Sequence, residues 1–381
     1  MRPATTRRLA AGIAVAGLAA AALALAGPDG SGATGTSEPT LQAAGLAMGG
    51  SWTDAQVRRY ASQFDLVVVG ASADAARVRR FHESRPGIVV LAYTCGFDVH
   101  DDAPLYGWIR GRHPDWFLTD AAGRRLHTYR DRHRWALDCG LPAVRAFFAD
   151  SAHRRRREIG ADGIFEDNVM PDWNGRNLAG RGARLARYAT PARWREALEL
   201  YLAALERAVA PAPVAANQVR PWTRHGRIVA IEEMPPGGEA WTERVRGLAA
   251  LSRDRTRTPL LVHALTGPDD PARAFVTASY LMAVEPGALL CLPCPGPRDS
   301  ARRLPEQSLV LGRPLGPARN AGGVWWRDFE RARILVNPTA RPLPGRWPGA
   351  AGGPVLPARG AGIAWRPGVA SSPRLADWVN R

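Results

Sequence analysis

Eight short apolar runs, most of them separated by helical patterns, constrain the fold of this chain more than any other feature. The runs are rich in Val, Ile and Leu and do not alternate with polar residues. This composition is typical of parallel strands that are covered on both faces. The runs occupy residues 44–50, 64–70, 87–96, 161–168, 212–219, 226–234, 258–265 and 287–293.

Helical patterns lie between most of these runs, at residues 53–63, 73–84, 141–160, 190–209, 240–254 and 270–284. Eight apolar runs, most of them alternating with helical patterns, predict an α/β fold, a (β/α)8 TIM barrel over residues 41–319. A doubly wound open sheet is the alternative. No Gly-x-Gly-x-x-Gly turn follows the first run to support a nucleotide-binding version of that sheet.

Two regions depart from the repeat. Residues 97–137 form a long insertion after the third run, dense in Trp, Tyr, His and Asp. Long loops at the C-terminal face of a barrel usually serve binding. Residues 320–381 carry no strong helical pattern, and the stretch GGVWWRDFERARILVNPT reads as two strands with a turn. We expect a small C-terminal β extension packed on the barrel.

The first residues have the pattern of an export signal. A basic start is followed by an uncharged run over residues 9–26 that ends in Ala-Leu-Ala, which fits a cleaved signal peptide over residues 1–26. A transmembrane anchor is the alternative, because 18 apolar residues could just span a bilayer. The Gly/Ser/Thr-rich linker over residues 27–40 favours cleavage. We expect a secreted protein without a stable membrane anchor.

The basic residues do not indicate a nucleic-acid partner. The formal net charge is +16, but the arginines are scattered, and no basic stripe is interleaved with aromatic residues that could stack bases. The chain contains no lysine. This absence excludes Schiff-base aldolases, pyridoxal-phosphate enzymes and Walker phosphate loops, all of which need one. We expect no cofactor.

The cysteines are expected to be structural. In an exported protein, Cys95 and Cys139 flank one long loop and are predicted to form a disulfide. Cys291 and Cys294 could form a tight disulfide, a redox pair or half of a zinc site, but no second pair at zinc-site spacing exists. The acidic stretch DVHDD at residues 98–102 is read as a solvated loop. No metal site is therefore expected.

Polar side chains stand where the apolar runs stop. In a barrel, the C-terminal ends of the strands ring one site. Reading those ends gives the candidates Tyr93, Thr94, Glu166, Asp167, Asn168, Asn217, Gln218, Glu232, Glu233 and His263. Carboxylates therefore end two strands, the fourth and the sixth.

A carboxylate pair of this kind indicates glycoside hydrolysis. One carboxylic acid protonates the leaving oxygen, and the other attacks the anomeric carbon or activates a water molecule. We predict Asp167 and one of Glu232 and Glu233, with Glu232 favoured, as the catalytic residues. Glu166 is the alternative to Asp167, and His263 is expected to contact substrate or support the structure. No Gly-x-Ser-x-Gly nucleophile elbow is present.

Tryptophans cluster in the expected loops on the same side of the barrel, where their flat faces could stack on sugar rings. These are Trp108, Trp116, Trp135, Trp173 and Trp222. The other substrate-binding candidates are Tyr93, Glu166, Asn168, Asn217 and His263. The expected partner is a polysaccharide or oligosaccharide.

Several motifs, taken in order, resemble a family of bacterial glycoside hydrolase-like (β/α)8 barrels distantly similar to polygalactosaminidases and α-galactosidase-type barrels. They are HPDWFLTDAAGRRL, WALDCGLPAVRAFF, GADGIFEDNV and RDFERARILVNPT. The likeness spans residues 44–345. It implies that Asp167 is the carboxylate of the fourth strand, that Glu232 or Glu233 is the acid of the sixth, and that Asp138 is architectural or near the sugar. The family commonly has an apolar residue where this chain has Glu166.

Two other readings stay open. A carbohydrate-binding barrel without catalysis would keep the aromatic loops and lack two facing carboxylates. A different barrel hydrolase, such as a metal-dependent deacetylase or phosphodiesterase, would gather His and Asp at the strand ends, where only His263 is well placed.

Overall fold

The structure is a computed structural model, and it describes residues 39–128, 131–169, 171, 185–218, 222–293, 303–344 and 355–366. The expected signal peptide, most of the expected linker, Trp173 and Cys294 lie outside the described residues. Among the helices described, none is both long and apolar enough to cross a membrane.

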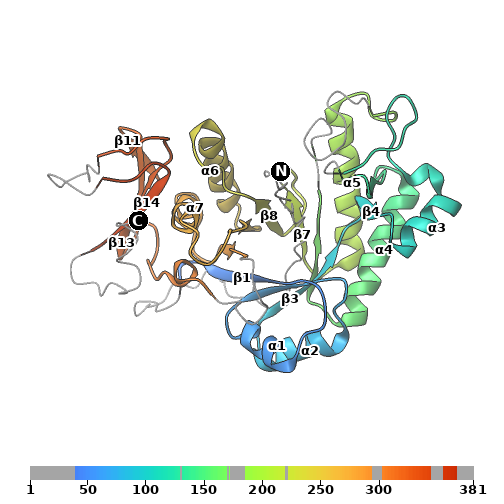
Figure 1. Cartoon of the computed structure of the whole chain (residues 1–381), viewed down its shortest axis with the longest axis horizontal. Helices are drawn as coiled ribbons and strands as arrows, with labels where there is room; N and C mark the ends of the chain where they lie inside the picture. The colour runs from blue at the N-terminus through green and yellow to red at the C-terminus, as the bar shows by residue number, and fades with distance from the viewer. Residues whose placement is uncertain are drawn as a thin grey trace, which may run out of the picture.

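Eight parallel strands close into a barrel, which confirms the predicted fold class (Figure 1). Each strand overlaps one of the eight apolar runs, and strands that are adjacent in the barrel come from consecutive runs, with the first and last runs closing it. The strands are β1 (Gln42–Ala47), β2 (Leu66–Val69), β3 (Val89–Thr94), β6 (Gly163–Glu166), β7 (Val214–Gln218), β8 (Ile228–Glu232), β9 (Thr258–Val262) and β10 (Leu289–Cys291).

Helices surround the barrel at the predicted positions. They are α1 (Asp54–Ala61), α2 (Ala75–Ser84), α4 (Pro142–Ile159), α5 (Pro191–Val209), α6 (Gly238–Ser252) and α7 (Ala272–Leu281). Pro142 occupies the first turn of α4, where its missing N–H costs nothing, and Gly160 ends that helix in the left-handed conformation with φ 69°. Between β7 and β8 the described residues hold no helix.

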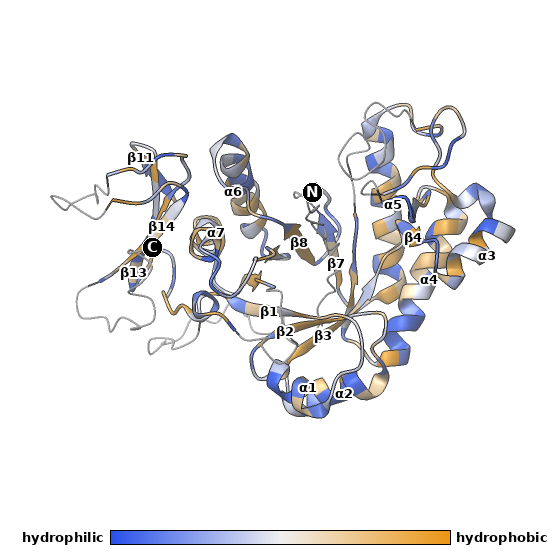
Figure 2. Cartoon of the chain, viewed as in Figure 1, coloured by the Kyte–Doolittle hydropathy of each residue, from blue (hydrophilic) through white to orange (hydrophobic). Residues whose placement is uncertain are grey.

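The apolar side chains divide between the barrel interior and the layer beneath the helices. Figure 2 shows predominantly hydrophobic barrel strands, with hydrophilic residues on the outer surfaces of α1 and α2. The interior cluster alternates along the strands with residues that pack under the helices. Because successive side chains of a strand point to opposite faces of the sheet, every second residue of each strand points into the barrel interior, and we call these positions the interior phase.

The insertion after β3 folds as a small unit of its own. It contains an antiparallel hairpin of β4 (Asp98–His100) and β5 (Arg134–Ala136), with α3 (Pro104–Arg112) and the short 3-10 helix η2 (Pro114–Trp116) between them. Figure 1 places α3 beyond α4, on the side of the molecule opposite the C-terminal strands.

The C-terminal region forms the predicted β extension. The expected hairpin is β12 (Val324–Asp328) with β13 (Ala332–Asn337), and β11 (Arg319–Ala321) and β14 (Gly360–Trp365) complete a four-stranded antiparallel sheet. This sheet packs on α7 through a shared apolar cluster (Figure 1). Another short 3-10 helix, η4 (Pro305–Ser308), lies between β10 and this sheet.

Candidate active site

Four polar side chains share the interior phase of the barrel at the C-terminal ends of β3, β6, β7 and β8. The apolar cluster inside the barrel includes the residue two positions before each of them, namely Leu91, Phe165, Ala215 and Ala230. The period of two therefore directs the next interior positions to the barrel mouth. Those positions are Tyr93, Asp167, Asn217 and Glu232.

Asn217 joins the two acids of this group. Its Nδ2 donates to Asp167 Oδ1 at 2.7 Å and to Glu232 Oε1 at 2.6 Å. Because both oxygens bind one nitrogen, they can be no more than about 5.3 Å apart. The structure thus brings a carboxylate of the fourth strand beside a carboxylate of the sixth.

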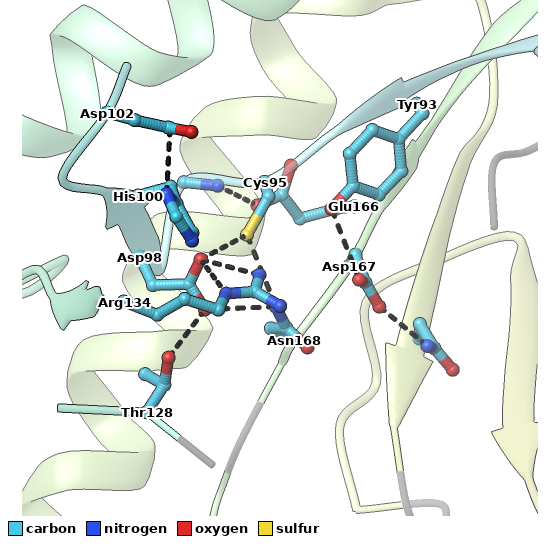
Figure 3. A network of polar contacts seen from close by, with 12 residues as sticks. Tyr93, Cys95, Asp98, His100, Asp102, Thr128, Arg134, Glu166, Asp167 and Asn168 are labelled. Carbon is cyan, nitrogen blue, oxygen red and sulfur yellow. Dashed lines mark hydrogen bonds and ion pairs between the residues drawn. The ribbon is translucent and has the colours of Figure 1, made fainter. Parts of the chain in front are cut away.

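Hydrogen-bond donors converge on Asp167, which is 3% exposed. Besides Asn217, the Tyr93 hydroxyl donates to Asp167 Oδ2 at 3.3 Å (Figure 3). The backbone N–H of Asn168 also contributes. Burial and the neighbouring Glu232 charge nevertheless raise the pKa of Asp167 to about 8. Burial likewise raises the pKa of Glu232. The site therefore contains two adjacent buried carboxyl groups, each of which has a raised pKa.

Glu166 lies on the opposite phase of β6 and faces the helices. It is fully buried and accepts hydrogen bonds from Thr94 Oγ1 at 2.7 Å, the Gly96 N–H at 2.6 Å and the Tyr201 hydroxyl at 2.9 Å. Burial raises the pKa of Glu166 to about 7. A Cβ at Gly96 would lie 2.1 Å from the Tyr201 hydroxyl, so only glycine fits there. Glu166 therefore connects β6 to the end of β3 and to α5. It has no hydrogen bond to Asn217 among the contacts described.

Glu233 turns away from the pair. Its backbone is in the left-handed region with φ 58°, and its side chain, 58% exposed, lies 2.6 Å from Nδ1 of His263. Although partial burial opposes ionisation, the hydrogen bond and charge of His263 lower the pKa of Glu233. Arg244 donates to the backbone carbonyls of Glu232 and Glu233 and holds this turn.

The base of the insertion carries a buried acidic residue that the sequence did not reveal. Asp98 accepts hydrogen bonds from Thr128 Oγ1 at 3.0 Å, Asn168 Nδ2 at 3.1 Å and Arg134, whose closest nitrogen lies at 2.7 Å (Figure 3). The reading of residues 98–102 as a solvated acidic loop is thus wrong for Asp98. Its place in a strand, before an apolar residue, was the available signal. The network ties the insertion to the residue that follows Asp167.

The predicted disulfide between Cys95 and Cys139 is wrong, because both are free thiols. Cys95 Sγ lies 3.7 Å from Asp98 Oδ1 and 3.5 Å from Asn168 Nδ2, so the thiol belongs to the network around Asp98. Cys139 is fully buried in the apolar core beneath the helices. Burial raises the pKa of both thiols.

Two other predicted substrate contacts have packing partners. Asp138 is 2% exposed and accepts hydrogen bonds from the Tyr188 hydroxyl and the Gly140 N–H, with Arg187 also paired to it. This arrangement is that of an architectural residue. Trp116 is 4% exposed and stacks on His113 with ring centroids 4.3 Å apart, so it presents no open face to a sugar.

Three further candidates, Gln218, Trp108 and Trp135, have no hydrogen bond to Asp167 or Glu232 among the contacts described. Gln218, beside Asn217, is buried and accepts a hydrogen bond from the Trp222 N–H at 3.2 Å. Trp108 is 40% exposed on α3, and Trp135 packs on His127 in the insertion. In the part of the chain that the structure describes, no group of three or more His, Cys, Asp or Glu residues could hold a metal ion.

The raised pKa of Asp167 predicts a pH-dependent stability. A carboxyl whose pKa rises from about 4 to about 8 on folding contributes stability that is complete below pH 4 and is lost as pH rises through 8. Asp167→Asn removes this loss. We expect the variant to gain on the order of 2–4 kcal/mol in free energy of unfolding at pH 8, and much less at pH 4.5.

Urea unfolding at the two pH values measures this difference. Asp150→Asn, at an exposed position on α4, is the matched control and should change stability little at either pH. An equal effect of Asp167→Asn at pH 4.5 and pH 8 would contradict the prediction.

A comparison with protein-family models gives a match to a family of glycosyl hydrolases. A family model described as "Hypothetical glycosyl hydrolase family 15" matches residues 82–333, about two thirds of the chain. The matched segment contains β3 to β10 and therefore all four polar residues at the barrel mouth. The search of curated proteins finds no match.

Solved structures similar to this chain include three carbohydrate-active proteins. The glycoside hydrolase domain of PelA from Pseudomonas aeruginosa is 18% identical, with a TM-score of 0.46 over 66% of this chain and 94% of that domain. An α-amylase from Geobacillus thermoleovorans is 11% identical, with a TM-score of 0.49 over 87% of this chain and all of that one. For the α-galactosidase TtGalA from Thermus thermophilus the identity is 18% and the TM-score 0.32, over 48% of this chain and 39% of that enzyme.

Proposed function

This chain belongs to the hypothetical glycosyl hydrolase family 15. We propose that it is an exported retaining glycosidase with Asp167 as nucleophile and Glu232 as acid–base. The family makes the chain a glycoside hydrolase. The residues, the stereochemical course and the export are inferred from this chain's own side chains.

The single observation that carries the mechanism is the Asn217 amide shared by Asp167 and Glu232. Retaining glycosidases hold their two carboxyl groups about 5–5.5 Å apart, whereas inverting enzymes need about 6.5–9.5 Å to admit a water molecule. The nearest oxygens of this pair are within about 5.3 Å of each other. This upper limit for one pair of oxygens is compatible with the retaining spacing, and the anomeric configuration of the first product distinguishes the two courses.

The roles follow from the surroundings of each acid. Asp167 receives donors from Asn217, Tyr93 and the Asn168 backbone, all of which favour its ionised form. Glu232 is less buried than Asp167 and accepts one of these donors. In the free protein, burial and the Glu232 charge outweigh these donors and raise the pKa of Asp167 to about 8. We infer that substrate binding moves the proton to Glu232 and leaves Asp167 as the carboxylate.

The reaction has two steps. An Asp167 oxygen attacks the anomeric carbon while Glu232 gives its proton to the glycosidic oxygen, and the C–O bond to the leaving sugar breaks. Glu232, now a carboxylate, then removes a proton from a water molecule that attacks the same carbon. The bond to Asp167 breaks, and the proton returns to Glu232. Both displacements invert the anomeric carbon, so its configuration is retained overall.

A screen against polysaccharides tests the function. The purified protein is incubated with bacterial exopolysaccharides and galactosaminoglycans, and released reducing ends are measured. Proton NMR of the first product then reports its anomeric configuration. We expect hydrolysis with retention. Saccharide binding without any release of reducing ends would favour a carbohydrate-binding barrel, and an inverted first product would contradict the nucleophilic role of Asp167.

Export rests on the uncharged run that ends in Ala-Leu-Ala before Gly27. We expect secreted material to begin near Gly27, because small residues at that spacing are what signal peptidases accept. N-terminal sequencing of protein from the culture medium measures this. Recovery of the chain in membranes with residues 1–26 attached would contradict it.

A further inference from the structure

The turn after Asp167 has an uncommon backbone conformation. Strand β6 ends at Glu166, and Asn168 lies in the left-handed region with φ 60°. Residues other than glycine seldom adopt this conformation, although asparagine does so more often than most. A backbone in this region persists where its surroundings hold it there. The contacts of Asn168 therefore show what the turn depends on.

Backbone hydrogen bonds tie the chain to the barrel on both sides of this turn. The Asp167 N–H donates to the carbonyl of Thr94, at the end of β3, at 3.0 Å. The Val169 N–H donates to the carbonyl of Asn217, in β7, at 3.1 Å. Only Asn168 lies between these two contacts. Its conformation therefore sets the direction in which the chain leaves Asp167.

The side chain of Asn168 is held by the insertion. Its Nδ2 donates to Asp98 Oδ2 at 3.1 Å, and the residue is 7% exposed (Figure 3). The other oxygen of Asp98, Oδ1, accepts from Arg134 Nη2 at 2.7 Å and from Nε at 3.2 Å. The Asp98 side chain is 3% exposed. A hydrogen bond to an ionised acceptor is stronger than one between neutral groups, so Asp98 anchors the Asn168 amide firmly.

We propose that Asn168 and Asp98 are positioning residues for Asp167. The ion pair of Asp98 with Arg134 fixes the side chain of Asn168. The turn at Asn168 then keeps the Asp167 carboxylate directed at the anomeric carbon. A displacement of about 1 Å at a reacting atom can cost on the order of 10²-fold in rate, so such a turn matters for turnover. The inference rests on the proposed role of Asp167 as nucleophile.

Two substitutions of Asn168 separate the side-chain contact from the backbone conformation. Asn168→Gly removes the hydrogen bond to Asp98, but glycine adopts a positive φ without strain. Asn168→Ala removes the same hydrogen bond and adds backbone strain, so it should unfold at a lower temperature than Asn168→Gly. We expect kcat to fall by roughly 30-fold or more in both variants, with KM changed by less than about threefold.

Steady-state kinetics on the polysaccharide identified by the screen measures kcat and KM separately. A loss confined to kcat indicates a misplaced nucleophile, because substrate binding is then intact. A merely structural role of the side chain would lower the unfolding temperature without this division between kcat and KM.

Asp98→Asn tests whether Asp98 acts through Asn168. An amide has a single oxygen, so it cannot accept from both Arg134 and Asn168 as the carboxylate does. We expect kcat to fall by roughly tenfold or more. Adding Asp98→Asn to Asn168→Gly should then lower kcat by no more than about a further twofold, because both changes break one connection. If Asp98→Asn does not fold, Arg134→Lys takes its place in the same comparison, since it keeps a cation beside Asp98 but loses one N–H donor.

Asp120→Asn is the matched control, because it changes another buried acid of the insertion. Asp120 accepts from the backbone N–H groups of Ala122 and Arg124 in its own turn, and it has no hydrogen bond to Asn168 among the contacts described. We expect this variant to unfold at a lower temperature while kcat stays within about twofold of wild type.

Wild-type kcat in Asn168→Gly would overturn the inference, because the left-handed backbone would then suffice without its side-chain contact. An equal loss of kcat in Asp120→Asn would also overturn it, since general weakening of the insertion would explain the effect. Fully additive losses in the double variant would overturn the role of Asp98. In each of these cases hydrolysis with retention by the wild type leaves the proposed function standing. A protein that hydrolyses no saccharide removes both proposals together.

Discussion

Asp167→Asn is expected to lower kcat by on the order of 10⁴-fold or more, with the fold intact. The asparagine amide has the shape of the carboxylate and can still accept the hydrogen bond from Asn217. It cannot attack the anomeric carbon, so no covalent intermediate forms. Reducing-end release on the polysaccharide identified by the screen measures the loss, and thermal unfolding checks the fold.

Glu166→Gln is the matched control for this substitution, because it also exchanges a buried acid for its amide on the same strand. The glutamine oxygen can accept from the Gly96 N–H and the Tyr201 hydroxyl, and its NH2 group can donate to Thr94. We expect it to retain activity within about tenfold. Wild-type turnover in Asp167→Asn, or loss of turnover only in Glu166→Gln, would reverse the assignment.

Glu232→Gln is expected to affect substrates according to their leaving groups. A sugar leaving group needs a proton, so kcat/KM on the natural polysaccharide should fall by roughly 10²–10⁴-fold. A 2,4-dinitrophenolate leaves without one, so kcat/KM on the corresponding aryl glycoside should fall by less than about tenfold. Steady-state kinetics on the two substrates measures this contrast.

The neighbouring acid provides the control for this second substitution. Glu233→Gln changes an exposed side chain that pairs with His263 and is not hydrogen-bonded to Asn217 in the contacts described. It should slow both substrates to a similar, small degree. Equal losses on both substrates in Glu232→Gln, or a leaving-group dependence in Glu233→Gln alone, would show that the acid–base is assigned to the wrong residue.

The fold could be read from the sequence because its signals are local. Parallel strands covered on both faces need unbroken apolar runs, and such runs, with amphipathic helices between most of them, admit few architectures other than a barrel. The ends of these runs also locate the candidate site, since all parallel strands deliver their C-terminal ends to one side. Tyr93, Asp167, Asn217 and Glu232 were all found in this way.

The sequence analysis favours Asp167 over Glu166 and Glu232 over Glu233, but the pattern alone does not fix which of two adjacent residues faces the barrel interior. Glu166 and Asp167 occupy opposite phases of β6, as a period of two requires, but which phase faces the interior depends on the register of the closed barrel. The same applies to Glu232 and Glu233, where the left-handed backbone at Glu233 redirects the chain toward His263.

Contacts between distant segments were decided by the tertiary structure alone. Cys95 and Cys139 flank one loop and looked like a pair, yet the Cys95 thiol is held in the polar network around Asp98 while Cys139 is buried in the apolar core. This network forms because the antiparallel pairing of β4 with β5 places Arg134 beside Asp98. The sequence by itself thus determined the barrel and the strand ends that carry its chemistry, because patterning and chain direction are local properties. Which side chains meet there was decided by strand phase and by the return of the insertion, which exist only once the barrel has closed.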